Sequence, residues 1–273
     1  MSDHSLDETK RLEDPPMNHS PVRIERDQGI GVVIMNRPDK LNALNLEMRR
    51  AIADAFLELS EDPNTEVIVV TGGSEVFAAG ADLKLLVDKD ACEVAELKLA
   101  SYWHPVATCQ KPVIAAVSGY CLGAGSELMQ MCDIIVADTC SSIGQPEAKV
   151  GIMPGAGGTQ RLIRSVGKPV ASLMLMCGET LSGERAYQLG LVSEVTEKGG
   201  SLNRATELAR KVTRMPPLAM RAIKRCLREG SDLPLPDALA LEQSEFLKLF
   251  DTSDQSEGMT AFLEKRRPKF TGN

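Results

Sequence analysis

Short apolar runs and longer stretches of helical periodicity alternate along this chain. Val113–Val117 and Ile134–Ala137 are continuous apolar runs rich in β-branched residues, which predicts strands buried on both faces. Residues 46–61 instead place apolar side chains at the spacing of one helix face, and Asn45 can cap that helix. Strands and helices that alternate in this way favour a parallel sheet with crossover helices.

The same reading gives a set of elements for the whole chain. A glycine turn at Gly119–Gly125 and a loop at Gly151–Gly158 separate elements in its centre. The predicted strands are 22–25, 31–35, 67–70, 113–117, 134–137 and 191–195, and the predicted helices are 45–61, 91–110, 126–132, 168–177, 182–190, 201–213, 217–228, 236–250 and 254–266.

Three regions follow from these elements. Residues 1–20 are polar and acidic, which predicts a flexible N-terminal tail. Residues 21–200 carry the alternating strands and helices, and we expect the active site there. Residues 201–273 are helical throughout, and a helical region appended to an α/β core exposes apolar faces that suit a partner subunit.

Composition narrows the class of protein. The chain has 273 residues and a formal net charge of −7, which disfavours the nucleic acid backbone as the main partner. The tail has no apolar stretch and no run reaches membrane-spanning length, so we expect neither a signal peptide nor a membrane partner, and a cytoplasmic location. Seven cysteines without CxxC spacing and three isolated histidines predict reduced thiols and no metal site.

Two carboxylates stand out in apolar and glycine-rich surroundings, Glu127 and Glu147. Strands that lead through glycine turns into helix starts often bind anions, and small residues from Val76 to Lys84 let a ligand approach the backbone. The plainer alternative is that one glutamate supports a helix start and the other a loop. The glycine-rich stretches lack GxGxxG spacing and a following GK[ST], which excludes NAD and ATP as cofactors.

Five segments in this order resemble the enoyl-CoA hydratases of the crotonase superfamily, over roughly residues 22–270. That resemblance implies an α/β fold, a crotonase-like spiral of repeated ββα units with a C-terminal all-helical trimerisation region. The segments are NRPDKLNAL (36–44), FAAGADLK (77–84), KPVIAAVSGYCLGAGSEL (111–128), IGQPEAKVGIMPGAGGTQRL (143–162) and EGMTAFLEKRRPKF (257–270).

The resemblance also implies a reaction, the reversible addition of water across the 2,3 double bond of a 2-enoyl-CoA thioester in fatty acid or aromatic acid catabolism. It assigns the oxyanion donors to the backbone N–H groups of Ala81 and Ala124, and the acid/base pair to Glu127 and Glu147. We expect Glu147 to exchange the proton at the α-carbon and Glu127 to orient or activate the water, although a coupled pair titrates as a unit. Ala124 stands where the family often has glycine.

The resemblance further implies that coenzyme A enters as part of the substrate, with no separate cofactor, and that the chain forms a homotrimer or homohexamer. The alternatives are a 3,2-enoyl-CoA isomerase, whose members commonly keep only the glutamate matching Glu147, and an RNA-binding relative, which the acidic balance disfavours. The positions implied for CoA binding are Lys40, Leu41, Ala79, Ala81, Asp82, Leu83, Lys84, Gly123, Phe262 and Lys265.

Overall fold

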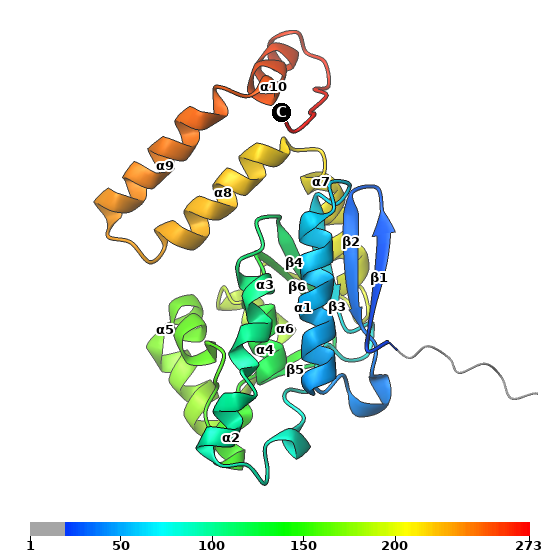
Figure 1. Cartoon of the computed structure of the whole chain (residues 1–273), viewed down its shortest axis with the longest axis vertical. Helices are drawn as coiled ribbons and strands as arrows, with labels where there is room; N and C mark the ends of the chain where they lie inside the picture. Colours follow the sequence, from blue (N-terminus) through cyan, green and yellow to red (C-terminus); the bar gives the residue numbers. More distant parts are fainter. Residues whose placement is uncertain (1–19) are drawn as a thin grey trace, which may run out of the picture.

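The computed structural model describes residues 20–273, so the predicted tail lies outside the described residues except for Ser20. Figure 1 shows a sheet flanked by helices, with three further helices forming an arm at one end. No helix within the described range is both long and apolar enough to cross a bilayer.

The larger sheet has six strands in the order β1-β2-β3-β4-β6-β9. The first two strands form an antiparallel hairpin, and every other neighbouring pair is parallel, which confirms the predicted parallel pairing. The strands are β1 (Val22–Asp27), β2 (Ile30–Met35), β3 (Val67–Thr71), β4 (Val113–Val117), β6 (Ile134–Asp138) and β9 (Glu194–Thr196).

Helices cover both faces of this sheet. The long helix α1 begins where predicted, because Oδ1 of Asn45 accepts a hydrogen bond from the N–H of Met48 at 2.8 Å. The helices of the core are α1 (Leu46–Glu61), α2 (Ala91–Glu96), α3 (His104–Ala107), α4 (Ala124–Met129), α5 (Gly158–Cys177), α6 (Gly183–Gln188) and α7 (Ser201–Val212), and the 3₁₀ turns are η1 (Pro38–Lys40), η2 (Leu83–Leu85), η3 (Leu99–Trp103) and η4 (Pro146–Val150).

Alternate residues of the central strands pack into two apolar layers. In β4, Val113, Ala115 and Val117 belong to the layer that contains α1, whereas Ile114 and Ala116 belong to the layer under α7. A strand with both faces covered has a continuous apolar sequence, which is why these strands were predictable. Helix α7 therefore belongs to the core, although the sequence placed residues 201–213 with the C-terminal helical region.

A second, smaller sheet stands where the sequence predicted no strands. It consists of β5 (Tyr120–Leu122), β7 (Ser142–Gly144) and β8 (Thr180–Ser182), with β5 parallel and β8 antiparallel to the central β7. The expectation of a plain glycine turn from 119 to 125 is therefore wrong. Strands of three residues are too short to show a period of two, so their pairing depends on neighbours far along the chain.

Two predicted helices differ from those observed. The stretch 91–110 is divided into α2, η3 and α3, and Lys98 between the first two has a left-handed φ of 48°. Helix α5 starts at Gly158, ten residues before the predicted start at 168, and breaks at Gly167, whose φ is 74° and ψ 165°. Its first half was missed because the glycine-rich start offers no polar side-chain cap.

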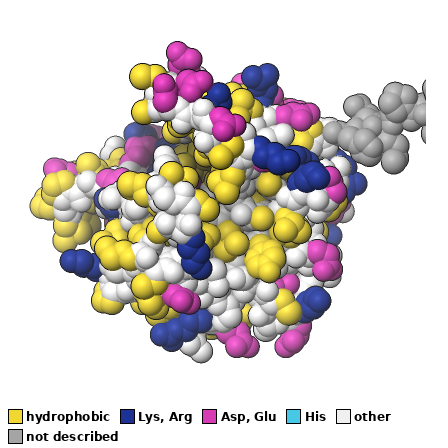
Figure 2. Space-filling view, turned by 90° about the horizontal axis from the view of Figure 1, so that it is seen from below, with side chains coloured by type: hydrophobic (Ala, Val, Ile, Leu, Met, Phe, Trp, Pro, Cys, Tyr) yellow, Lys and Arg dark blue, Asp and Glu magenta, His cyan; other side chains and the backbone are white. Residues whose placement is uncertain are grey.

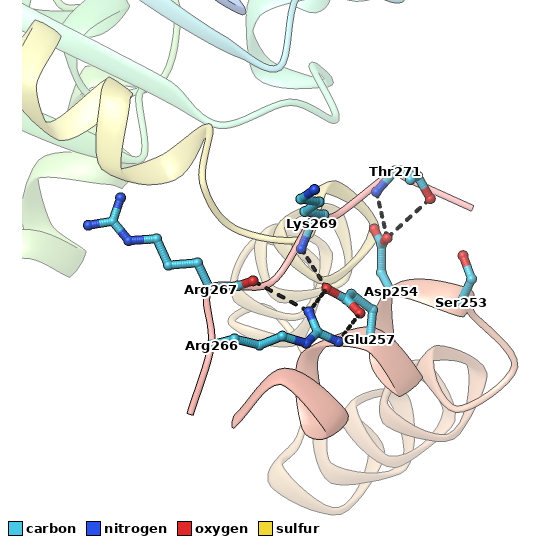
Figure 3. A pocket seen from close by; sticks show the side chains of 7 residues that line it. All are labelled: Ser253, Asp254, Glu257, Arg266, Arg267, Lys269 and Thr271. Carbon is cyan, nitrogen blue, oxygen red and sulfur yellow. Dashed lines mark hydrogen bonds and ion pairs between the residues drawn. The ribbon is translucent and has the colours of Figure 1, made fainter. Parts of the chain in front are cut away.

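The arm consists of α8 (Pro217–Gly230), α9 (Leu235–Leu249) and α10 (Ser253–Leu263), of which α8 and α9 pack side by side (Figure 1). After α10 the chain folds back, and the N–H of Thr271 donates to Oδ1 of Asp254 at 2.7 Å. Figure 3 shows this closure, in which Arg266 binds Glu257 through two hydrogen bonds of 2.7 and 2.8 Å. The surrounding residues line a pocket of about 410 Å³.

Candidate active site

Two segments far apart in sequence run side by side and build the centre of the candidate site. Ala78 pairs with Cys121 in a parallel bridge, and the N–H of Leu122 donates to the carbonyl of Ala78 at 3.0 Å. Gly125 permits the close approach, since a Cβ there would lie 2.7 Å from the Cβ of Ala78. Because both segments run in the same direction from the bridge, they carry their following residues to one place.

Ala81 and Ala124 each stand three residues beyond that bridge. Ala124 is the first residue of α4, where backbone N–H groups have no partner within the helix. Neither its N–H nor that of Ala81 donates to another described residue, although the neighbours of Ala81 do bond: Leu44 donates to Gly80 at 2.8 Å and Asp82 donates to Leu44 at 3.3 Å. Two free donors therefore lie on adjacent segments.

Glu127 lies in the first turn of α4 and is almost completely buried, with 3% of its surface exposed. Its Oε1 accepts hydrogen bonds from the N–H groups of Ala156 at 2.7 Å and Gly158 at 2.9 Å. The loop that precedes α5, read from sequence only as a glycine-rich loop, thus folds over this carboxylate. Two backbone amides thus hold Oε1 in place, while Oε2 has no hydrogen-bond partner among the described residues.

Glu147 lies in the first turn of η4 and is partly buried. Burial raises the pKa of Glu147 to about 7; a hydrogen bond from its own backbone N–H opposes the rise, and the negative charge of Glu127 adds to it. A Cβ built on Gly123 would lie 3.0 Å from Oε1 of Glu147, and the carbonyl of Gly123 accepts the N–H of Glu127 at 2.9 Å, so the carboxylate of Glu147 lies beside the helix turn that carries Glu127. The pair therefore combines a carboxylate held by two backbone amides with one that titrates close to neutrality.

Gln145, a completely buried residue, holds Glu147 in place and was missed by the sequence reading. We assign its amide so that Nε2 donates to both carboxylate oxygens of Glu147, at 3.1 and 3.2 Å, while Oε1 accepts from Nε2 of Gln130 at 3.2 Å. The only sequence signal was its place just before Pro146-Glu147.

Half of the positions expected to bind CoA lie along the segment that carries Ala81. The N–H of Ala79 donates to the carbonyl of Leu41 at 3.0 Å, which brings the turn with Lys40 beside the residues 79–84. Asn42, buried and not anticipated, fixes this arrangement because its Nδ2 contacts the carbonyls of Gly72, Val76 and Phe77 at 3.0 to 3.2 Å. Gly123 directly precedes α4.

Figure 2 views the molecule from the end that carries α2, and shows hydrophobic side chains over much of this face with both basic and acidic side chains among and around them. Leu83 in η2 is 47% exposed, and Lys84 beside it is exposed. An exposed apolar side chain next to a cation suits a ligand with a hydrocarbon part and an anionic part.

Phe262 and Lys265 do not join the other expected CoA positions within one chain. They belong to α10 and the residues after it, at the far end of the arm from α4 (Figure 1). Phe262 is 82% exposed there. Among residues 20–273, no group of His, Cys, Asp and Glu has an arrangement that could hold a metal ion.

Comparison with known proteins gives consistent matches over nearly the whole chain. The family model described as enoyl-CoA hydratase/isomerase matches residues 25–273. The 2,3-dehydroadipyl-CoA hydratase of Escherichia coli K12 is 42% identical over 253 residues, covering 93% of this chain and 99% of that protein. The probable enoyl-CoA hydratase echA8 of Mycobacterium tuberculosis is 39% identical over 255 residues, with the same coverage.

Solved structures agree with the sequence matches. An enoyl-CoA hydratase subunit from Geobacillus kaustophilus is 38% identical with a TM-score of 0.90, covering 93% of this chain and 98% of that chain. The enoyl-CoA hydratase from Mycobacterium tuberculosis H37Rv is 36% identical with a TM-score of 0.84, covering 93% of this chain and all of that one.

Proposed function

The chain belongs to the enoyl-CoA hydratase/isomerase family, and on that premise we propose that it is a 2-enoyl-CoA hydratase whose acid/base pair is Glu127 and Glu147. The observation that carries this proposal is that Glu127 and Glu147 occupy one site. Two buried or partly buried glutamates lie near each other, one bound by two backbone amides and the other with its pKa raised to about 7.

The free N–H groups of Ala81 and Ala124 supply the first requirement of the reaction. When water adds to the β-carbon, the electrons of the double bond move onto the thioester oxygen, which becomes an enolate. Donors fixed in place before the charge develops stabilise it without reorganisation, and each such donor contributes about 3 to 4 kcal/mol. Alanine at 124 donates the same N–H as the glycine often found there in the family.

The two glutamates handle the protons. Glu127 accepts one proton from water while the water oxygen bonds to the β-carbon, and Glu147 gives its proton to the α-carbon as the enolate collapses. The result is a 3-hydroxyacyl-CoA, a protonated Glu127 and an ionised Glu147. Transfer of the proton from Glu127 to Glu147, directly or through solvent, restores the starting state.

The isomerase alternative receives no support from the relatives described above, which are named hydratases. An isomerase moves one proton between carbons and needs a single base, whereas this site carries a second glutamate held by its own pair of amides. The net charge of −7 likewise gives no reason to invoke RNA.

We propose that CoA binds along the residues 79–84 with Lys40, Leu41 and Gly123, and that Phe262 and Lys265 reach the site of a neighbouring subunit. The arm supports assembly as a homotrimer or homohexamer, because it exposes apolar side chains that a monomer leaves in water. These include Ile223, Leu227, Leu235, Leu239, Phe246, Leu247, Phe250, Phe262 and Leu263.

We further propose that the enzyme acts in fatty acid or aromatic acid catabolism in the cytoplasm and needs no cofactor beyond the CoA of its substrate. All seven cysteines are free thiols, which fits a reducing compartment. Addition of water requires no redox chemistry, and the residues of the site already supply a base, an acid and an oxyanion site.

The direct test is whether the purified chain hydrates crotonyl-CoA. The reaction is monitored through the loss of absorbance of the enoyl thioester, and the 3-hydroxyacyl product is then identified. A panel of longer, aromatic and dicarboxylic 2-enoyl thioesters would define the acyl group. Hydration of at least one of them is expected. Conversion of 3-enoyl to 2-enoyl thioesters without any hydration product would overturn the proposal in favour of an isomerase.

A further inference from the structure

A chain of hydrogen bonds connects the helix α4 to the carboxyl group of Glu147. It starts at Ser126 in α4, passes through the side chains of Gln130 and Gln145, and ends at Glu147. Nε2 of Gln130 lies 3.2 Å from both the carbonyl oxygen and Oγ of Ser126, and it also lies 3.2 Å from Oε1 of Gln145. Nε2 of Gln145 donates to the two oxygens of Glu147 at 3.1 and 3.2 Å. Two side-chain amides therefore join the proposed acid to α4.

The direction of every donor in this chain is set at its first member. The carbonyl of Ser126 can only accept a hydrogen bond, so the amide of Gln130 must turn its NH₂ group toward it. That NH₂ group has a second hydrogen, which reaches Gln145 and requires an acceptor there. Oε1 of Gln145 therefore faces Gln130, and its NH₂ group faces Glu147.

Gln130 keeps this orientation although its own acceptor is left unpaired. Oε1 of Gln130 is buried and has no hydrogen-bond partner among residues 20–273. Turning the amide over would bring this oxygen against the carbonyl of Ser126 and Oε1 of Gln145, which are both acceptors. An unpaired buried acceptor is unfavourable by itself, so the donor bonds of Nε2 must outweigh it.

Packing fixes the place of the Gln145 amide but not which of its ends faces Glu147. Gln145 is completely buried, and a Cβ built on Gly158 would lie 2.7 Å from its amide group. Because the oxygen and the NH₂ group of an amide have nearly the same shape, a reversed amide would fit the same space. It would place an acceptor against the carboxylate of Glu147, and the bond to Gln130 is what opposes this reversal.

We propose that Gln130 is a positioning residue for hydration, which acts through Gln145 to hold the carboxyl group of Glu147 in a fixed orientation. The inference rests on the proposed function and deepens it, because an acid delivers its proton efficiently only from a defined geometry. With Gln130 in place, Gln145 donates to Glu147 and stabilises the carboxylate that remains after the proton has left. Without Gln130, the amide of Gln145 can reverse, accept a hydrogen bond from protonated Glu147 and retain its proton.

The charged groups around Glu147 do not replace this chain. Burial raises the pKa of Glu147 most, and the negative charge of Glu127 from α4 adds to the rise. Lys149 of η4 extends over Gly178, and Arg161 of α5 donates to a backbone carbonyl of the preceding loop at 2.8 Å. Within the described part of the chain, the amide at position 145 is the one side chain that bonds to the carboxyl group of Glu147.

The test uses Gln130→Met, which has nearly the shape of glutamine but no donor. With crotonyl-CoA, kcat should fall about tenfold with little change in KM, because the carboxyl group loses its orientation while substrate binding is untouched. The pKa of Glu147 should rise by about one unit, which corresponds to the loss of a hydrogen bond to a charged group. The alkaline limb of the kcat–pH profile measures this pKa. An NMR titration of ¹³C-labelled glutamate carboxyl groups measures it too, with the signal identified by its absence in Glu147→Gln.

A double-mutant cycle separates positioning from a merely structural role. In a Gln145→Met background, Gln130→Met should change neither kcat nor the titration further, because the connection to Glu147 is already lost. The matched control is Gln110→Met, which removes an exposed amide that donates only to the carbonyl of Thr108. It should behave as wild type in both measurements.

An unchanged pKa of Glu147 in a folded Gln130→Met chain would overturn the inference, as would an equal further loss in the Gln145→Met background. If Gln130→Met does not fold, Gln130→Glu keeps the shape of the side chain and lacks the donor when ionised, and the cycle cancels the effect of its added charge. The NMR titration needs no turnover, so failure of the hydratase assay and failure of this inference are separate outcomes.

Discussion

The carboxylate of Glu147 occupies the space that a side chain on Gly123 would need. A Cβ built on Gly123 would lie 3.0 Å from Oε1 of Glu147, and the glycine itself has a φ of +50° that side chains rarely allow. Gly123 precedes α4 and thereby sets the direction of the free N–H of Ala124. The same glycine also lies beside Glu147, the proposed acid. One turn of backbone thus positions both the proposed oxyanion donor and the proposed proton donor.

Gly123→Ala should therefore lower the hydration rate at least tenfold. The added methyl group must displace Glu147 or the start of α4, and displacements of about 1 Å at a reacting group can cost a hundredfold. Steady-state kinetics with crotonyl-CoA measures the effect. Gly155→Ala is the control, because a Cβ there meets nothing within 4 Å, and it should retain nearly full activity.

Replacing either acid of the pair with glutamine should reduce kcat by about 10²- to 10⁴-fold, the range for loss of a general acid or base. Glu127→Gln and Glu147→Gln keep the shape of the side chain while removing its proton chemistry. Glu61→Gln, at an exposed position of α1, serves as the control and should be indistinguishable from wild type. Turnover that survives in both site variants would reject the assignment.

The pH dependence of kcat should show an alkaline decline with a midpoint near pH 7. The proposed acid must carry a proton to deliver it, and the pKa of Glu147 is raised to about 7 chiefly by burial. The measurement is kcat from pH 5 to 10 with the thioester substrate at saturation, which reports the pKa of the acid in the enzyme–substrate complex. A rate that is constant through this range would mean that Glu147 does not act as the acid.

The same raised pKa predicts that Glu147→Gln gains stability relative to wild type as pH rises. An unfolded glutamate ionises near its model value of 4.5, while the folded one holds its proton to about 7, so wild type loses stability between those values. Above pH 7 the variant should be more stable by roughly 1 to 3 kcal/mol, given about 1.4 kcal/mol per pKa unit and partial exposure. Below pH 4 the two should be equal in denaturant unfolding.

A charge on the apolar face of the arm should break the proposed assembly. Phe246 is 57% exposed and packs edge-on against Phe250, with ring centroids 5.0 Å apart. Phe246→Asp should shift the sedimentation profile toward the monomer, because it would place an unpaired charge in an apolar interface. Ser244→Asp, exposed on the same helix, should keep the wild-type profile. A wild-type chain that sediments as a monomer would contradict the proposal directly.

Several parts of the fold were determined by short-range pattern alone. Apolar periodicity and helix capping involve only residues within ten or twenty positions of each other. They were therefore enough to predict the buried strands β3, β4 and β6 and the helix α1 with its Asn45 cap. The two glutamates could be selected for the same reason, since their polar character interrupts an apolar and glycine-rich stretch.

Other features depend on residues that meet only after folding. The amides that bind Glu127 come from positions 156 and 158, about thirty residues downstream, and the pairing of Ala78 with Cys121 spans a still longer stretch of chain. No local period encodes such contacts, which explains why the small sheet, the first half of α5 and the role of Gln145 were missed.

The amino-acid sequence by itself determined the family and the buried strands and predicted the two acids, because periodicity, composition and motif order are properties of the unfolded chain. Only the tertiary structure decided which glutamate is bound by two backbone amides, which one has its pKa raised to about 7, and that the end of the arm lies far from its own site. Burial, electrostatic coupling and the direction of a free N–H arise from distances between remote segments, and those distances exist only once the chain has folded.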